Sequence, residues 1–80
     1  MNVTVLLFAS YSDVLGTSRL TVRLPASATV ADVLADLRAR PGAERLPPSP
    51  LVAVNQEYAS PMSAVHAGDE VAVIPPVAGG

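Results

Sequence analysis

The stretch Thr29-Val30-Ala31-Asp32-Val33-Leu34-Ala35-Asp36-Leu37-Arg38 predicts the main helix of this 80-residue chain. Thr29 can cap free amides of the first turn, while the Asp32 carboxylate reaches back and favours the positive end of the helix dipole. Apolar side chains at positions 30, 33, 34 and 37 form one stripe at helical spacing. Asp36 and Arg40 stand four residues apart in the order that favours an ion pair. Pro41-Gly42 ends the helix.

Two strands are predicted before this helix. The segment from Val3 to Ala9 is short, aliphatic and rich in β-branched residues, as in a largely buried strand. From Ser18 to Leu24, apolar and polar side chains alternate, so we expect a half-exposed strand that pairs antiparallel with the first. Between the two strands, the sequence predicts a single helical turn that Ser10 caps and Gly16 closes.

Three further strands follow a proline-rich connection. Residues 41–50 hold four prolines and predict an extended loop. Short strands are expected at Leu51–Val54, at Tyr58–Ser60 and at Glu70–Ile74, with turns at 55–57 and 67–69. The order is therefore strand, strand, helix, strand, short strand, strand.

This order predicts an α+β fold in which a mixed sheet packs against one main helix. A right-handed crossover through the helix places a later strand parallel to the first. That arrangement is the ubiquitin-like β-grasp. We expect one β-grasp domain over residues 1–76 and an extended C-terminal tail over residues 77–80.

Composition excludes several classes of protein. The chain has no cysteine, so it has no disulfide, thiolate zinc site, iron–sulfur cluster or thiol nucleophile. Its net charge is −2 and its five arginines are scattered, which disfavours nucleic-acid binding. The longest apolar run, residues 5–9, is far shorter than the roughly 20 residues of a membrane span. With no secretory signal either, we expect a cytoplasmic protein with no membrane partner.

The polar residues of the chain do not form a recognisable catalytic or metal-binding motif. His66 is the only histidine and has no nearby carboxylate or cysteine at metal-ligand spacing, so a surface role is favoured. Ser10, Ser12 and Ser18 lie near Asp13 but lack the glycine elbow of a nucleophilic serine. No phosphate-cradling glycine loop exists, so any ATP must be bound by a partner. No metal site is predicted.

The C-terminal segment carries the strongest functional signal: Pro75-Pro76-Val77-Ala78-Gly79-Gly80. The prolines offer no amide donor to the sheet, and their fixed φ favours a stiff, extended departure. After Val77 every side chain is a methyl group or a hydrogen, so the tail can thread a narrow tunnel and deliver its terminal carboxylate. Its six residues span about 20 Å when fully extended. The alternatives are a frayed terminus or an expression remnant, although a remnant would not explain the two prolines.

The chain resembles the small subunits of molybdopterin synthase, which are ubiquitin-like sulfur carriers, over nearly all of its length. The most specific features are the Gly-Asp-Glu-Val segment and the terminal Pro-Pro-Val-x-Gly-Gly. The stretches that carry the resemblance are Val5-Leu6-Leu7-Phe8-Ala9, Leu15-Gly16, Ala28-Thr29-Val30, Val52-Ala53-Val54-Asn55, Gly68-Asp69-Glu70-Val71-Ala72 and Pro75-Pro76-Val77-Ala78-Gly79-Gly80.

The resemblance implies that the Gly80 carboxylate is the reactive group. An adenylating enzyme of the ubiquitin-activating type would activate it with ATP, and a sulfur donor would convert it to a thiocarboxylate. The tail would then enter the large synthase subunit and give sulfur to a pterin precursor, with two loaded carriers used for each dithiolene. The catalytic groups would belong to the large subunit, in a heterotetramer of two small and two large subunits. This chain would bind no cofactor itself.

The residue pattern also predicts a docking surface at the root of the tail. Leu6 and Phe8 share one face of the first strand, and Ile74 ends the last strand. If these strands run parallel, the three side chains form an apolar patch suited to a partner protein, unless a short helix or loop covers them. Arg19 and Arg23 share a strand face that either is simply solvated or meets an acidic partner.

Three other functions remain open on the sequence. A thiamine-pathway sulfur carrier has the same tail chemistry. A protein modifier would join Gly80 to a target lysine, although the absence of lysine here excludes chains self-linked through side chains. A non-covalent β-grasp binding module would make no use of the tail.

Overall fold

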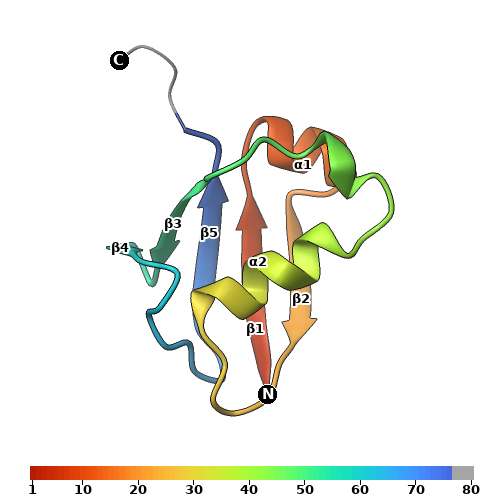
Figure 1. Cartoon of the computed structure of the whole chain (residues 1–80). Coiled ribbons are helices and arrows are strands. Elements are labelled where there is room, and N and C mark those ends of the chain that lie inside the picture. The colour runs from red at the N-terminus through yellow and green to blue at the C-terminus, as the bar shows by residue number, and fades with distance from the viewer. Residues whose placement is uncertain (77–80) are drawn as a thin grey trace.

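The computed structural model describes residues 1–76, and its chain begins with two strands that pair across a short helix. Figure 1 shows the helix α2 lying across one face of a mixed sheet. The elements are β1 (Asn2–Leu7), α1 (Ser10–Leu15), β2 (Arg19–Arg23), α2 (Val30–Arg38), the 3₁₀ turn η1 (Ala43–Arg45), β3 (Leu51–Val54), β4 (Glu57–Ala59) and β5 (Glu70–Ile74).

The sheet has the strand order β2-β1-β5-β3-β4. β1 pairs antiparallel with β2 and parallel with β5, and β3 pairs antiparallel with both β4 and β5. The last strand therefore lies in the middle of the sheet beside the first, as the crossover argument predicts (Figure 1). This topology confirms the predicted ubiquitin-like β-grasp.

The core lies between α2 and the face of the sheet that we call the inner face. Alternate residues of β1 and β5 point to this face and are almost completely buried, because side chains along a strand alternate between its two sides. The apolar stripe of α2 covers them, as predicted. The residues at the centre of this contact are Val3, Val5, Leu7, Val30, Val33, Leu37, Val71 and Val73.

The predicted start of α2 is confirmed at Thr29, whose backbone N–H donates to the Asp32 carboxylate over 2.8 Å. The predicted ion pair of Asp36 and Arg40 is also present, with 2.9 Å between Arg40 Nη2 and Asp36 Oδ2. Both interactions are local and depend on helical spacing alone, which explains why the sequence suffices to predict them.

The predicted cap of α1 is wrong. The helix begins at Ser10 itself, and its N-cap position is Ala9, with φ at 48° and no side-chain cap. β1 ends at Leu7, two residues earlier than predicted, and Phe8 donates its N–H to Val73 O over 3.2 Å. The chain must then turn sharply at Ala9, which shifts the helix start by one residue. Gly16 closes the helix in the left-handed conformation, as expected.

Tyr11 is a core residue that the sequence pattern does not predict. Its ring is buried, and its hydroxyl donates a hydrogen bond to the Pro47 carbonyl. Arg38 Nη2 donates to the same carbonyl over 3.2 Å. Burial raises the pKa of the Tyr11 hydroxyl, and the nearby Arg38 charge partly opposes that rise. This contact ties α1 to the proline-rich segment, which contains the 3₁₀ turn η1 where an extended loop was expected.

Candidate functional site

The root of the tail is held between two neighbouring strands. β5 ends at Ile74, where it is paired with Leu51 of β3, and Val73 is paired with Leu7 of β1. The chain then leaves the sheet through Pro75, which is half-buried, and Pro76, which is exposed. Val77, Ala78, Gly79 and Gly80 lie outside the described residues, so the roles assigned to them stay predictions. The predicted boundary between the domain, residues 1–76, and the tail, residues 77–80, also stays a prediction.

The three predicted docking residues lie on the face of the sheet opposite α2, which we call the outer face. Leu6 is paired with Ala72 of β5, and Ile74 lies two residues further along that strand, on the same face. Phe8 follows β1 with 45% of its surface exposed, whereas Leu6 and Ile74 are half-buried. A docking role for these residues stays a prediction.

Two further apolar residues share this face and were missed by the sequence analysis. Leu51 is paired with Ile74 and is 42% exposed. Tyr58 is paired with Ala53, a neighbour of Ala72, and is 79% exposed. The pattern of β3 could have indicated Leu51, but the place of Tyr58 depends on the strand order. We call the five residues together the outer apolar patch: Leu6, Phe8, Leu51, Tyr58 and Ile74.

A cationic border flanks this patch on the β2 side. Arg19 is paired with Leu6, and Arg23 is paired with Asn2. Both arginines are exposed, and Thr21 lies between them. The outer face therefore changes from apolar over β3, β5 and the end of β1 to positively charged over β2.

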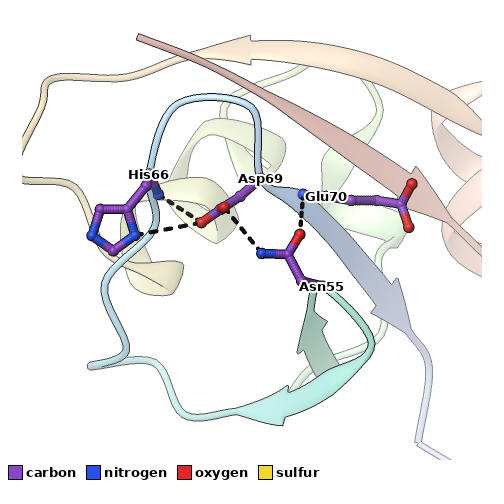
Figure 2. Close-up of polar contacts among 4 residues, drawn as sticks. All are labelled: Asn55, His66, Asp69 and Glu70. Atoms are coloured by element: carbon purple, nitrogen blue, oxygen red, sulfur yellow. Dashed lines mark hydrogen bonds and ion pairs between the residues drawn. The ribbon is translucent and has the colours of Figure 1, made fainter.

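A polar cluster fixes the other end of β5 (Figure 2). The Asn55 side-chain amide donates to Asp69 Oδ1 over 3.0 Å, while its carbonyl oxygen accepts the Glu70 N–H over 3.0 Å. The His66 backbone N–H donates to Asp69 Oδ2 over 2.7 Å. The hydrogen bond from Asn55 has the largest effect on the Asp69 carboxyl and lowers its pKa. The hydrogen bond from the His66 backbone lowers it further. The cluster links the β3–β4 turn to the beginning of β5.

The expectation that His66 has no nearby carboxylate is wrong. Its Nδ1 lies 3.7 Å from Asp69 Oδ2, because the turn before β5 brings residues 66 and 69 together. The ring itself is 76% exposed. Within residues 1–76, no further carboxylate lies close enough to His66 and Asp69 to complete a metal-binding group.

The described part of the chain contains no cavity, so the outer face is its most distinctive surface. Nor does any helix within residues 1–76 have the length and apolarity needed to cross a membrane.

Comparison with known proteins identifies the family. A family model described as the ThiS family matches residues 5–80. The chain belongs to the ThiS family. It is 39% identical over 83 residues to the molybdopterin synthase sulfur carrier subunit of Chlamydomonas reinhardtii, and the match covers both chains completely. These findings confirm the resemblance stated above.

Two solved structures extend the comparison of this ThiS-family chain. A Pyrococcus furiosus protein described as subunit 1 of molybdopterin converting factor superposes with a TM-score of 0.85 at 27% identity, covering 96% of this chain and 99% of the other. Small archaeal modifier protein 1 from Haloferax volcanii superposes with a TM-score of 0.83 at 34% identity, covering 95% and 98%. Both therefore share the fold of this chain.

In this ThiS-family chain, the outer apolar patch and the polar cluster lie toward opposite ends of β5. Among residues 1–76, His66, Asp69 and Asn55 gather at the end of β5 that lies opposite the root of the tail (Figure 2). The reactive group expected from the sequence is the terminal carboxylate of Gly80.

Proposed function

We propose that this chain is the sulfur carrier subunit of a molybdopterin synthase. In this role it gives sulfur to a pterin precursor during molybdenum cofactor biosynthesis. The observation that carries the proposal is the terminal Pro-Pro-Val-Ala-Gly-Gly, which follows the central strand β5 directly in a member of a sulfur-carrier family. A chain end with no bulky side chain is the part of such a fold that can enter another protein's active site.

The proposed chemistry proceeds at the Gly80 carboxylate. One carboxylate oxygen attacks the α-phosphate of ATP, pyrophosphate leaves, and an acyl-adenylate forms in the partner enzyme. A sulfide-level sulfur donor then attacks the acyl carbon and AMP leaves, so the product is a thiocarboxylate. In the synthase, the thiocarboxylate sulfur attacks an electrophilic carbon of the pterin precursor and displaces the oxygen substituent of that carbon, and water then cleaves the resulting acyl–sulfur bond. That hydrolysis returns Gly80 to a carboxylate and leaves the sulfur on the pterin.

The large synthase subunit is the partner expected to supply the catalytic groups. The outer apolar patch supports such a contact, because an exposed cluster of large apolar side chains on a small domain is typical of a protein interface. The patch includes Ile74, the last residue of β5 before the C-terminal segment. One docking event would therefore bring both the patch and the tail to the same partner.

Mass spectrometry tests the loading step. The full chain is incubated with ATP, a sulfide source and an adenylating enzyme of the ubiquitin-activating type. The mass of its C-terminal peptide is then measured. We expect replacement of one oxygen by one sulfur on the peptide that ends at Gly80. A variant lacking Gly79 and Gly80 is the matched control and should stay unmodified. An unchanged carboxylate in the full chain, under conditions that load a known carrier, contradicts the proposal.

A second candidate is a protein modifier, which the name of the Haloferax volcanii neighbour favours. The activated Gly80 would then form an amide with a lysine of another protein. The two functions differ in their products, because the modifier leaves Gly80 bound to a target and the carrier leaves it free. Incubating the activated chain with host extract, digesting with trypsin and searching for lysines that carry the remnant of residues 46–80 separates them, because Arg45 is the last trypsin site before Gly80. Abundant remnants with no sulfur transfer to a pterin precursor favour the modifier.

A further inference from the structure

β2 is an edge strand of the sheet, and over part of its length its outward backbone groups have no hydrogen-bond partner among residues 1–76. Leu24 and Met1 exchange two backbone hydrogen bonds of 2.8 and 2.7 Å. In an antiparallel ladder, residues alternate between those that bond across the pair and those whose backbone groups point away. Counting from Leu24, the backbone groups of Arg19, Thr21 and Arg23 therefore point away from β1 and toward the edge.

Thr17 closes one end of this edge. Its Oγ1 donates to the Arg19 carbonyl over 2.9 Å and accepts the Arg19 N–H over 3.3 Å. Thr21 and Arg23 have no equivalent partner among residues 1–76, so two N–H donors and two carbonyl acceptors remain open there. A row of unpaired donors and acceptors is the pattern with which an added extended chain forms hydrogen bonds.

The side chains on this strand indicate the charge of such a chain. Arg19 and Arg23 are exposed on the outer face, and in the described part of the protein neither takes part in an ion pair. Residues directly opposite each other on paired strands interact, and opposite charges stabilise the pair. Carboxylates on an added strand would therefore meet both arginines.

Other occupants fit this edge less well. A second copy of β2 would bring arginines against arginines, which destabilises strand pairing. The phosphate backbone of a nucleic acid offers acceptors for the N–H groups and the arginines, but no donors for the Thr21 and Arg23 carbonyls. An extended peptide supplies both donors and acceptors.

We propose that the β2 edge binds an extended acidic segment of a partner protein, which adds to the sheet as a sixth strand. The segment pairs with Thr21 and Arg23, and its carboxylates lie opposite Arg19 and Arg23. This surface is separate from the sulfur chemistry, because β1 lies between β2 and β5. The proposal therefore holds or fails independently of the role of Gly80.

Peptide titration tests the charge requirement. A capped peptide of alternating valine and glutamate is added to the isotope-labelled full chain, and backbone amide signals are followed. We expect slower hydrogen exchange at the Thr21 and Arg23 amides, and no binding of a valine–lysine peptide of equal length. The double variant Arg19→Glu/Arg23→Glu should bind the glutamate peptide at least about tenfold more weakly.

A proline substitution tests the backbone requirement without changing charge. Thr21→Pro removes one outward N–H on an edge strand, where proline is tolerated, and should weaken binding about tenfold. Thr21→Val keeps the N–H and should bind like the original chain. Equal binding by a folded Thr21→Pro, signal changes confined to the outer apolar patch, or no binding of the glutamate peptide would each overturn the proposal. If Thr21→Pro does not fold, the charge-reversed variant and the lysine peptide decide.

Discussion

Two non-glycine residues with positive φ connect β3 to β4. Asn55 has φ at 50° and Gln56 has φ at 72°, as the two central positions of a type I′ hairpin turn require. Asparagine tolerates this conformation well, and its side chain holds Asp69 and Glu70. Gln56 has no such contact among the described residues and adopts the left-handed conformation at a cost in free energy.

Replacing Gln56 by glycine should therefore stabilise the protein. We expect the free energy of unfolding to rise by about 0.5–1 kcal/mol, since the relief of left-handed strain exceeds the added flexibility of the unfolded chain. Urea unfolding with an unchanged denaturant slope measures the effect. Gln56→Ala keeps the strain and serves as the control. A lower midpoint for Gln56→Gly than for the alanine variant would contradict this interpretation.

Asp69 makes stability depend on pH. Hydrogen bonds from Asn55 and His66 lower the pKa of the folded carboxyl below its ordinary value of 3.8. The folded state therefore binds fewer protons than the unfolded state in this range, so the stabilisation is present above about pH 4 and is lost as the pH falls through the folded pKa.

The variant Asp69→Asn should show this dependence directly. At pH 7 we expect it to unfold more easily than the original chain by up to about 1 kcal/mol, because solvent screens these exposed hydrogen bonds. The difference should shrink at pH 3, because below the ordinary pKa of 3.8 the unfolded carboxyl of the original chain takes up a proton more readily than the folded one. Urea unfolding at both pH values is the measurement. A difference of the same size at both would show that the charge of Asp69 has no part in the effect.

At the scale of elements, local signals predicted α2 and the strand faces well. Thr29 and Asp32 mark the helix start within four residues, and alternation assigns Val3, Val5 and Leu7 to the core. Contacts between distant segments were not predictable in this way. Tyr11 is buried because the proline-rich segment passes over α1, and Leu51 joins Ile74 because β3 lies beside β5. Neither fact is encoded within a window of ten residues.

The outer apolar patch is expected to bind a partner without supporting the fold. Phe8→Ser should weaken binding to the large synthase subunit by at least about tenfold, since exposed aromatic side chains often dominate an interface. The free energy of unfolding should change by less than about 0.5 kcal/mol. Calorimetric titration and urea unfolding measure the two effects.

Met62 offers a matched control for this experiment. It is 82% exposed and follows Pro61, whose carbonyl accepts the Ala31 N–H of α2, so it lies away from the outer apolar patch. Met62→Ser removes a large exposed apolar side chain of similar kind. If Met62→Ser and Phe8→Ser weaken binding equally, general surface apolarity explains the loss and the patch is not the docking site.

At the scale of the whole molecule, the fold places the two ends of β5 in different environments. Polar hydrogen bonds from Asn55 and Asp69 fix one end, and the outer apolar patch surrounds the other. The tail leaves from the apolar end. If a partner covers the patch, we expect it also to contact residues 77–80, whose role is predicted from the sequence alone.

Sulfur transfer in a single turnover tests the central claim most directly. The chain is first loaded as the thiocarboxylate with isotopic sulfur and is then mixed with the large synthase subunit and the pterin precursor. The masses of the product and of the peptide that ends at Gly80 are measured by mass spectrometry. We expect the isotope in the molybdopterin dithiolene and a plain carboxylate on Gly80, with two carriers consumed for each product. Product that lacks the isotope, or a Gly80 thiocarboxylate that persists while product forms, would contradict the assignment of this chain as the sulfur carrier.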